Sequence, residues 1–274
     1  MNPVISEWLN LLFRWFHIFT GILWIGSTWY FTWLDFRVRE AIARSEKTGE
    51  PPIVWMVHSG GFYRVEKLSN PGVDPSRLHW FKWEALFTWI SGILLLGIVY
   101  YSSEGILTDS DVSGLTHLQA VGMCLGMLMV GWVVYDLIFS TPIANSDIAS
   151  LAVGYVLVLG VAWLLLHTLA SRAAYLHIGA LFGTLMTLNV WMRILPAQKQ
   201  LVAALKDKRQ PEQRLADRAK LRSKHNTFLV VPLVFTMISN HFPTATYGND
   251  HAFLVLAVLI AAGWAVAGFV RGKV

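Results

Sequence analysis

Hydrophobic residues along the chain form seven segments, each close to the roughly 20 residues that an α-helix needs to cross a bilayer. These segments cover about residues 8–34, 83–101, 117–140, 148–170, 174–195, 227–242 and 252–270. The pattern predicts an all-α polytopic membrane protein, a bundle of about seven transmembrane helices that forms a single membrane domain over residues 1–274. The sixth segment is the shortest, and Pro232 is expected to kink its helix.

Basic residues in the connections predict the orientation of these helices. The connections after the first and fifth segments are rich in Lys and Arg, whereas residues 102–116 and 243–251 contain neither. Cytoplasmic connections of membrane proteins carry the excess of positive charge. We therefore expect an integral protein of a bacterial-type inner membrane, with the N-terminus outside and the C-terminus in the cytoplasm. The net charge of +5 is then a topology signal, so we expect the lipid bilayer, and not nucleic acid, as a partner.

Two further elements are predicted in the basic connections. Residues 53–58 and 62–67 flank the tripeptide Ser59-Gly60-Gly61, a pattern typical of a short β-hairpin with a tight glycine turn. We place this hairpin in the first long cytoplasmic loop. Residues 209–224 alternate charges with apolar residues at helical spacing, which predicts a surface helix leading into the sixth segment.

Composition supports the membrane assignment and limits the redox chemistry. The chain has 274 residues, of which 55% are hydrophobic and only 14% charged, and it contains 13 Trp. The first apolar segment is too long for the core of a signal peptide. Because Cys124 is the only cysteine, the chain cannot hold an iron–sulfur cluster or a covalent c-type haem by itself. Any redox centre must be held by histidines or belong to another protein.

The first apolar segment contains ionisable residues that are costly at membrane depth. Helical spacing places Arg14, His17 and Gly21 on one stripe. Gly21 would leave room for the edge of a haem, with His17 as a ligand of its iron. The alternative is a histidine that is hydrogen-bonded between packed helices.

A second histidine is needed if one haem b is held from both sides. His177 lies at a matching depth in the fifth segment, so His17 and His177 are the predicted pair of iron ligands. His241, at the outer end of the sixth segment, competes as the second ligand. We expect one haem b, with room for a second if His79 and His225 also bind iron.

Polar and aromatic residues gather at the predicted cytoplasmic ends of three segments. Such a group suits a planar, anionic ligand, with cations holding the charge, amides pairing with its edges and a Trp on its face. The alternative is an ordinary aromatic and basic interface belt. The predicted substrate-binding residues are Trp80, Asn189, Arg193, Lys224, Asn226 and Thr227.

Four long motifs carry a family resemblance. HIFTGILWIGSTWYFTWLD, the pair GGFYRVEK and LHWFKWEA, HIGALFGTLMTLNVWMRILPAQ, and KHNTFLVVPLVFTMISNHFPTATYG together resemble the membrane domain of the PuuD-type urate oxidases, also called urate hydroxylases. The match covers nearly the whole chain. The first segment is also similar to HemJ-type protoporphyrinogen oxidases and CopD-like proteins, and the HemJ resemblance implies haem binding at His17.

The resemblance to the urate oxidases implies oxidation of urate to 5-hydroxyisourate, with electrons passing through haem to a c-type cytochrome. A base such as His79 or His225 would take a proton from the attacking water. Family members commonly carry a C-terminal cytochrome c domain, and this sequence has no Cys-x-x-Cys-His motif before Val274. A separate cytochrome is therefore the expected acceptor.

Two other functions remain open from the sequence. A haem-dependent enzyme of the protoporphyrinogen-oxidase type would keep the cofactor and change the substrate. A transporter of a small anion or a metal would use Arg14 and the histidines to line its path.

Overall fold

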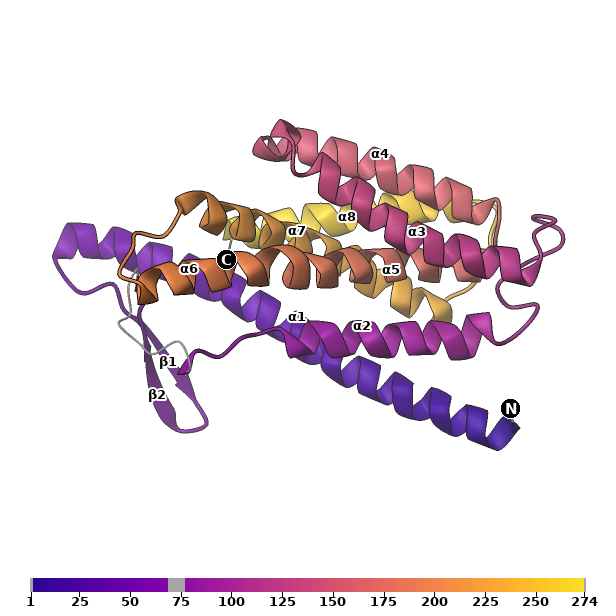
Figure 1. Cartoon of the computed structure of the whole chain (residues 1–274), viewed down its shortest axis with the longest axis horizontal. Helices are drawn as coiled ribbons and strands as arrows, with labels where there is room; N and C mark the ends of the chain where they lie inside the picture. Colours follow the sequence, from indigo (N-terminus) through magenta and orange to yellow (C-terminus); the bar gives the residue numbers. More distant parts are fainter. Residues whose placement is uncertain (1, 69–76, 274) are drawn as a thin grey trace.

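Long helices form almost the whole structure, with one small hairpin. The computed structural model describes residues 2–68 and 77–273. In chain order the elements are α1 (Pro3–Thr48), β1 (Val54–His58), β2 (Gly61–Val65), α2 (Trp83–Leu96), η2 (Gly97–Tyr101), α3 (His117–Ile138), η3 (Pro142–Asn145), α4 (Asp147–Leu166), α5 (Ser171–Leu188), η4 (Asn189–Ile194), α6 (Leu195–Lys206), α7 (Gln213–Ile238), η5 (Ser239–His241) and α8 (Ala252–Lys273). Figure 1 shows their arrangement.

Within the described residues, six helices are long and apolar enough to cross a membrane. They are α1, α2 with η2, α3, α4, the continuous helix Ser171–Lys206, and α8. The prediction of an all-α membrane protein with a short hairpin is therefore confirmed. Helix α7 is too polar to be counted among them, yet it runs the length of α5. Asn226 of α7 bonds Asn189, and Thr236 lies against Gly179 at the other end of α5.

Three helices differ from the predicted boundaries. α1 extends far beyond residue 34, because no breaker occurs before Gly49, which caps the helix in the left-handed conformation. The fifth helix continues through the π-helical segment η4 into α6. Pro196 is the second residue after η4, where its missing N–H favours a shift in the helical hydrogen bonding.

The predicted surface helix at 209–224 and the sixth apolar segment are a single helix, α7. Pro232 lies inside this helix and is buried. A Cβ at Gly263 of α8 would lie 3.1 Å from the Pro232 ring, so the two helices approach closely at this point. α7 ends at Ile238, and a 3₁₀ turn over Ser239–His241 follows.

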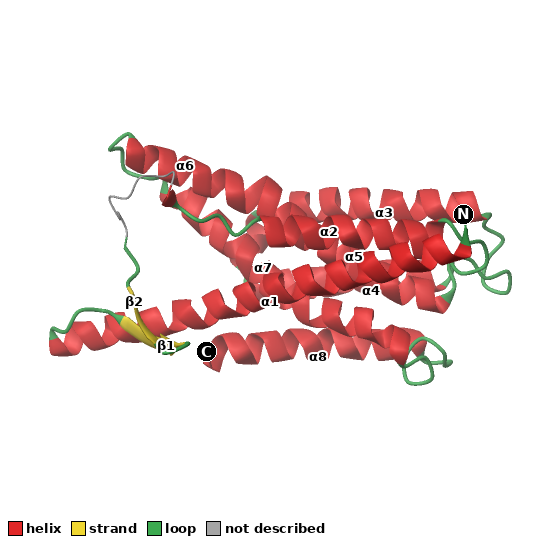
Figure 2. Ribbon diagram, turned by 90° about the horizontal axis from the view of Figure 1, so that it is seen from below, coloured by secondary structure: helices red, strands yellow, loops and turns green. Residues whose placement is uncertain are grey.

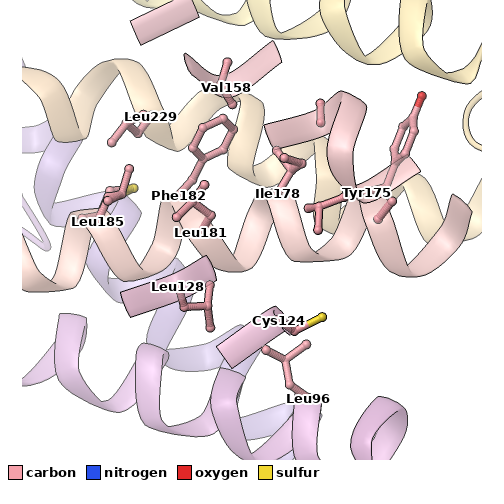
Figure 3. Packing of buried hydrophobic residues seen from close by; sticks show 14 of the residues in the cluster. Leu96, Cys124, Leu128, Val158, Tyr175, Ile178, Leu181, Phe182, Leu185 and Leu229 are labelled. Carbon is pink, nitrogen blue, oxygen red and sulfur yellow. The ribbon is translucent and has the colours of Figure 1, made fainter. Parts of the chain in front are cut away.

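Helix α5 lies at the centre of the bundle and packs against α2, α3, α4 and α7 (Figures 1 and 2). Its side chains Tyr175, Ile178 and Phe182 are almost completely buried and form the middle of the apolar core in Figure 3. α1 packs mainly on α2 and leaves large apolar side chains exposed along residues 4–23. A lipid environment would cover them.

The hairpin β1–β2 projects beside α1 at the end of the bundle toward which the C-terminus also lies (Figure 2). We call this the hairpin end. Val54 pairs with Val65 and His58 with Gly61, and the turn uses positive φ angles of 49° at Ser59 and 77° at Gly60. The N-terminus lies at the opposite end. The two termini therefore lie toward opposite ends of the bundle (Figure 2).

Candidate functional site

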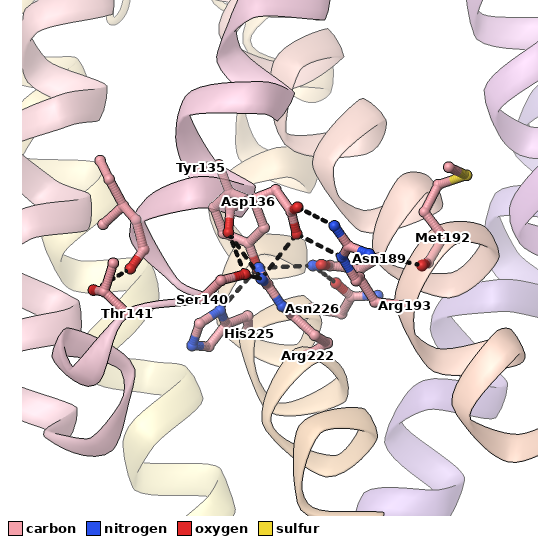
Figure 4. Close-up of polar contacts among 11 residues, drawn as sticks. Tyr135, Asp136, Ser140, Thr141, Asn189, Met192, Arg193, Arg222, His225 and Asn226 are labelled. Carbon is pink, nitrogen blue, oxygen red and sulfur yellow. Dashed lines mark hydrogen bonds and ion pairs between the residues drawn. The ribbon is translucent and has the colours of Figure 1, made fainter. Parts of the chain in front are cut away.

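A buried group of polar side chains joins α3, η4 and α7 (Figure 4). It lies toward the hairpin end of the bundle, where α5 continues through η4 into α6 (Figure 1). We call it the polar cluster, and it consists of Tyr135, Asp136, Asn189, Arg193, Arg222, His225 and Asn226. α3 supplies the first two residues, the π-helical segment η4 the next two, and α7 the last three. π-helical segments inside α-helices are frequent at functional sites.

Asp136 is paired with two arginines. Its carboxylate accepts from Arg193 Nε at 2.8 Å and from Arg193 Nη2, and from Arg222 Nη2 at 2.9 Å. Arg222 is only 1% exposed, and its guanidinium carbon lies 4.9 Å from the centre of the Tyr135 ring. One carboxylate facing two guanidinium groups leaves the polar cluster with an excess positive charge, which favours a bound anion.

A chain of hydrogen bonds crosses the polar cluster. Asn189 Nδ2 donates to Asn226 Oδ1 and to the Tyr135 hydroxyl oxygen, both at 2.8 Å. The Tyr135 hydroxyl lies 2.8 Å from Nδ1 of His225. Because the tyrosine oxygen already accepts from Asn189, its proton is free to point at Nδ1. The neutral His225 ring then carries its proton on Nε2.

Two buried residues of the polar cluster keep unused hydrogen-bonding groups. Arg222 Nε and Nη1 and Asn189 Oδ1 are all buried without a partner. Leaving such groups unpaired costs about 1–3 kcal/mol each, and more for a charged group. They supply two donors and one acceptor from rigid helices, which a planar ligand with mixed donor and acceptor edges can satisfy.

An apolar cavity of about 540 Å³ lies next to the polar cluster. It is bounded by α3, α4, α5, α7 and Trp264 of α8, and we call it the α3–α4 cavity. Tyr135 and His225 belong both to the polar cluster and to the wall of this cavity. Lys224 lies at the same end, where its Nζ is 2.5 Å from Asp147 Oδ2.

Only three of the six predicted substrate-binding residues belong to the polar cluster. Asn189, Arg193 and Asn226 lie in the polar cluster, and Lys224 lies at the end of the cavity. Thr227, which follows Asn226 on α7, is buried, and its hydroxyl oxygen accepts a hydrogen bond from Arg271 Nη1 at 3.1 Å. Trp80 is half-buried in the segment before α2, outside the described contacts of the polar cluster.

Of the two predicted bases, the structure brings only His225 into the polar cluster. His79 is exposed, and its ring lies 4.5 Å from that of Phe81, centroid to centroid. Among residues 2–68 and 77–273, Tyr135 is hydrogen-bonded to His225 and Asn189, and neither it nor Asn189 is hydrogen-bonded to His79.

His17 is arranged as a metal ligand would be. Its Nδ1 lies 2.9 Å from the carbonyl oxygen of Thr88 and 3.0 Å from the Ser91 hydroxyl. A hydrogen bond from Nδ1 to a carbonyl leaves Nε2 as the nitrogen with a free lone pair, the usual arrangement of iron-binding histidines. Gly92 lies beside the ring, where a Cβ would be 3.1 Å from His17 Cε1.

His177 is arranged differently. It is fully buried, its Nδ1 lies 2.7 Å from the Ala173 carbonyl, and its Nε2 lies 3.0 Å from the Tyr101 hydroxyl. Both ring nitrogens are therefore occupied. Thr88 and Ser91, the partners of His17 on α2, precede Tyr101 by roughly 10–13 residues, or roughly 15–20 Å of helix. The structure thus places the two histidines at different depths, and they do not form the two sides of one haem site.

The other predicted cofactor residues have contacts or exposure that differ from those of His17. Arg14 is exposed and bonds Asn10 at 3.0 and 3.1 Å. Gly21 faces Thr88 of α2, whose methyl group would lie 3.8 Å from an added Cβ, so α2 fills the space expected for a haem edge. His241 is exposed in η5. Of the predicted iron ligands, His17 therefore keeps Nε2 without a described partner, whereas both ring nitrogens of His177 are occupied.

Tyr135, Asp136 and Arg222 were not expected from the sequence as site residues. Asp136 carried a usable signal, because it is the only acid in the apolar segment 117–140, and a charge at membrane depth marks a site. Arg222 carried none, since it lies in a run of alternating charges that is typical of a solvated helix.

The fold and this site define a helical membrane protein with a buried, positively charged polar cluster beside an apolar cavity. A family model described as "Urate oxidase N-terminal" matches residues 3–273, so the chain belongs to this family. This confirms the resemblance to the membrane domain of the PuuD-type urate oxidases. Searches of curated proteins and of solved structures found no match.

Proposed function

We propose that this chain oxidises urate to 5-hydroxyisourate and that the polar cluster is the urate site. The family supports urate oxidation. The observation that supports the position of the site is the buried Arg222, with Nε and Nη1 unpaired, in the same polar cluster as the unpaired Asn189 Oδ1. The reaction adds one water oxygen to urate and releases two electrons and two protons.

Urate at neutral pH is a planar anion with carbonyl acceptors and N–H donors around its edge. The excess positive charge of the Arg222, Arg193 and Asp136 group offsets the cost of bringing this anion into a buried site. The unpaired guanidinium nitrogens would hold an anionic edge, and Asn189 Oδ1 would accept from an N–H group. Rigid placement on three packed helices lowers the cost of orienting the ligand.

Protons leave through the hydrogen-bond chain. In the proposal the Tyr135 oxygen takes a proton from the attacking water as its own proton passes to Nδ1 of His225, 2.8 Å away. His225 is thus the proposed base, reached through Tyr135. Asn189 donates to the Tyr135 oxygen and so orients the hydroxyl proton of Tyr135 toward His225.

Haem b is the cofactor that we propose for the one-electron steps, with a separate c-type cytochrome as acceptor. The chemistry it supplies is storage of single electrons between a two-electron donor and a one-electron acceptor. His17 is the residue that fits as its ligand. We further propose an inner-membrane location with the hairpin end in the cytoplasm, in accord with the basic connections at that end.

The test compares purified wild-type protein with Arg222→Gln and Arg218→Gln in an anaerobic assay of urate consumption with a soluble dye as acceptor. Arg218 is exposed one turn earlier on the same helix, so its variant is the matched control. We expect Arg222→Gln to lose at least 100-fold in kcat/KM for urate and Arg218→Gln to match wild type. Equal activity of all three would refute the site, and a wild type that leaves urate unchanged with every acceptor would refute the function.

A further inference from the structure

The α3–α4 cavity has the shape of a site for a chain-like ligand. Its lining extends from Met123 to Phe139 on one side and from Asp147 to Leu164 on the other. At 1.5 Å per helical residue, both sides are roughly 25 Å long. Apolar side chains line this length, and polar groups occur at the hairpin end.

The cavity is accessible from the membrane. Val130, Leu151 and Leu164 line it and are 60%, 39% and 43% exposed. α3 and α4 each pack on α5 and have little direct contact with each other. A hydrophobic molecule dissolved in the bilayer can therefore enter between these two helices.

The polar end of the cavity offers a hydrogen-bond donor connected to a proton source. The bond from Tyr135 to Nδ1 of His225 leaves the proton of the neutral ring on Nε2. Figure 4 shows this second nitrogen turned away from the polar cluster. The same His225 ring lines the cavity. It can donate a proton there and recover one through Tyr135.

We propose that the α3–α4 cavity binds a membrane quinone, with one head carbonyl against His225 Nε2 and the isoprenoid chain along α3 and α4, as an electron acceptor for urate. This inference rests on the proposed function and adds an electron exit beside the cytochrome. Urate, water and quinone give 5-hydroxyisourate and quinol. The two electrons lost by urate reduce the quinone, and the two protons released bind its two oxygens, one of them delivered through Tyr135 and His225.

The contacts favour a quinone over a phospholipid as the occupant. A phosphate head needs a free cation, and Lys224 is already paired with Asp147 at 2.5 Å. A quinone head needs a neutral donor and a supply of protons. The bond between Tyr135 and His225 provides both, and a phospholipid would use neither.

Two glycines of α3 provide a matched test. A Cβ at Gly126 or at Gly122 meets no atom within 4 Å, so a larger side chain fits at either position. Gly126 lines the cavity and Gly122, about one turn earlier, does not. A leucine at position 126 therefore occupies ligand space, whereas a leucine at position 122 does not.

The experiment uses the full chain in lipid nanodiscs under anaerobic conditions, with urate as donor and decylubiquinone as acceptor. We expect Gly126→Leu to reduce the quinone at least tenfold more slowly than wild type and Gly122→Leu to match wild type. All three should reduce a soluble dye equally with urate. Equal quinone reduction by Gly126→Leu and wild type would overturn the proposal, as would a wild type that reduces the dye but not the quinone.

A direct binding measurement separates this inference from the proposed function. If urate reduces no acceptor, the proposed function fails, and retention of a photoreactive ubiquinone is then compared in wild type and Gly126→Leu. Labelling of α3 or α4 that is lost in Gly126→Leu supports the quinone site. Labelling that is unchanged in the variant, or a tightly bound phospholipid that the quinone does not displace, refutes it.

Discussion

The pairing of Asp136 with two arginines leads to a quantitative prediction for Asp136→Asn. The two partners differ in exposure, since the Arg222 side chain is 1% exposed and that of Arg193 is 31% exposed. Arg193 can turn toward solvent when the carboxylate is lost, which limits its contribution to about 1 kcal/mol. Arg222 cannot, and removing one partner of a buried ion pair costs about 3–5 kcal/mol. We therefore expect Asp136→Asn to lower the folding equilibrium constant by about 10²- to 10⁴-fold.

Reversible unfolding in mixed micelles, followed by tryptophan fluorescence, measures this loss. Arg193→Gln is the control and should destabilise by no more than about 1 kcal/mol. The double variant Asp136→Asn with Arg222→Gln should recover part of the loss, because it no longer contains the unpaired buried charge. The charge argument is wrong if Asp136→Asn loses no more unfolding free energy than Arg193→Gln. It is also wrong if the loss in the double variant equals the sum of the losses in Asp136→Asn and Arg222→Gln.

Three further predictions concern other parts of the chain. His17→Ala should abolish the haem absorption spectrum whereas His177→Ala should leave it in place, because only His17 has a nitrogen free for iron; the reverse result would refute the assignment. Asn226→Ala removes the acceptor that orients the polar cluster, so KM for urate should rise about tenfold at unchanged haem content; an unchanged KM would contradict this. Gly179→Val should prevent folding by collision with α7, as judged by aggregation in detergent, whereas Gly26→Val, which meets no atom within 4 Å, should fold normally; equal yields would contradict the close packing.

The apolar segments predict much of the fold because spanning length is a local property of the sequence. The second span, predicted at 83–101, is observed as Trp83–Tyr101, and the last, predicted at 252–270, is observed as Ala252–Lys273. The hairpin was predictable for a similar reason, since Ser59 and Gly60 form the turn that the pattern indicates. Each of these elements depends on residues that are close together in the chain.

Features that depend on distant partners could not be predicted in the same way. α7 resembles a surface helix followed by a short span, because nothing near Arg222 in the sequence indicates its partner Asp136 on α3. The ends of the apolar segments predict equal depths for His17 and His177, but α1 continues beyond its apolar part at both ends. His225 and Asn189 were found from the sequence, since both lie where a polar residue begins or ends an apolar segment.

The polarity of α7 has a consequence for how the protein is made. A helix with this many charges does not enter a bilayer by itself, since each Arg at the centre of an isolated helix costs several kcal/mol. Asp136 and Asn189 leave the ribosome before Arg222, so their helices can be inserted in the membrane before α7 is made. Synthesis from the N-terminus thus places the polar partners of α7 in the membrane before α7 itself. Moving the α7 segment ahead of α3 in a rearranged gene should leave it stranded outside the bilayer, although every contact of the finished protein would still be encoded.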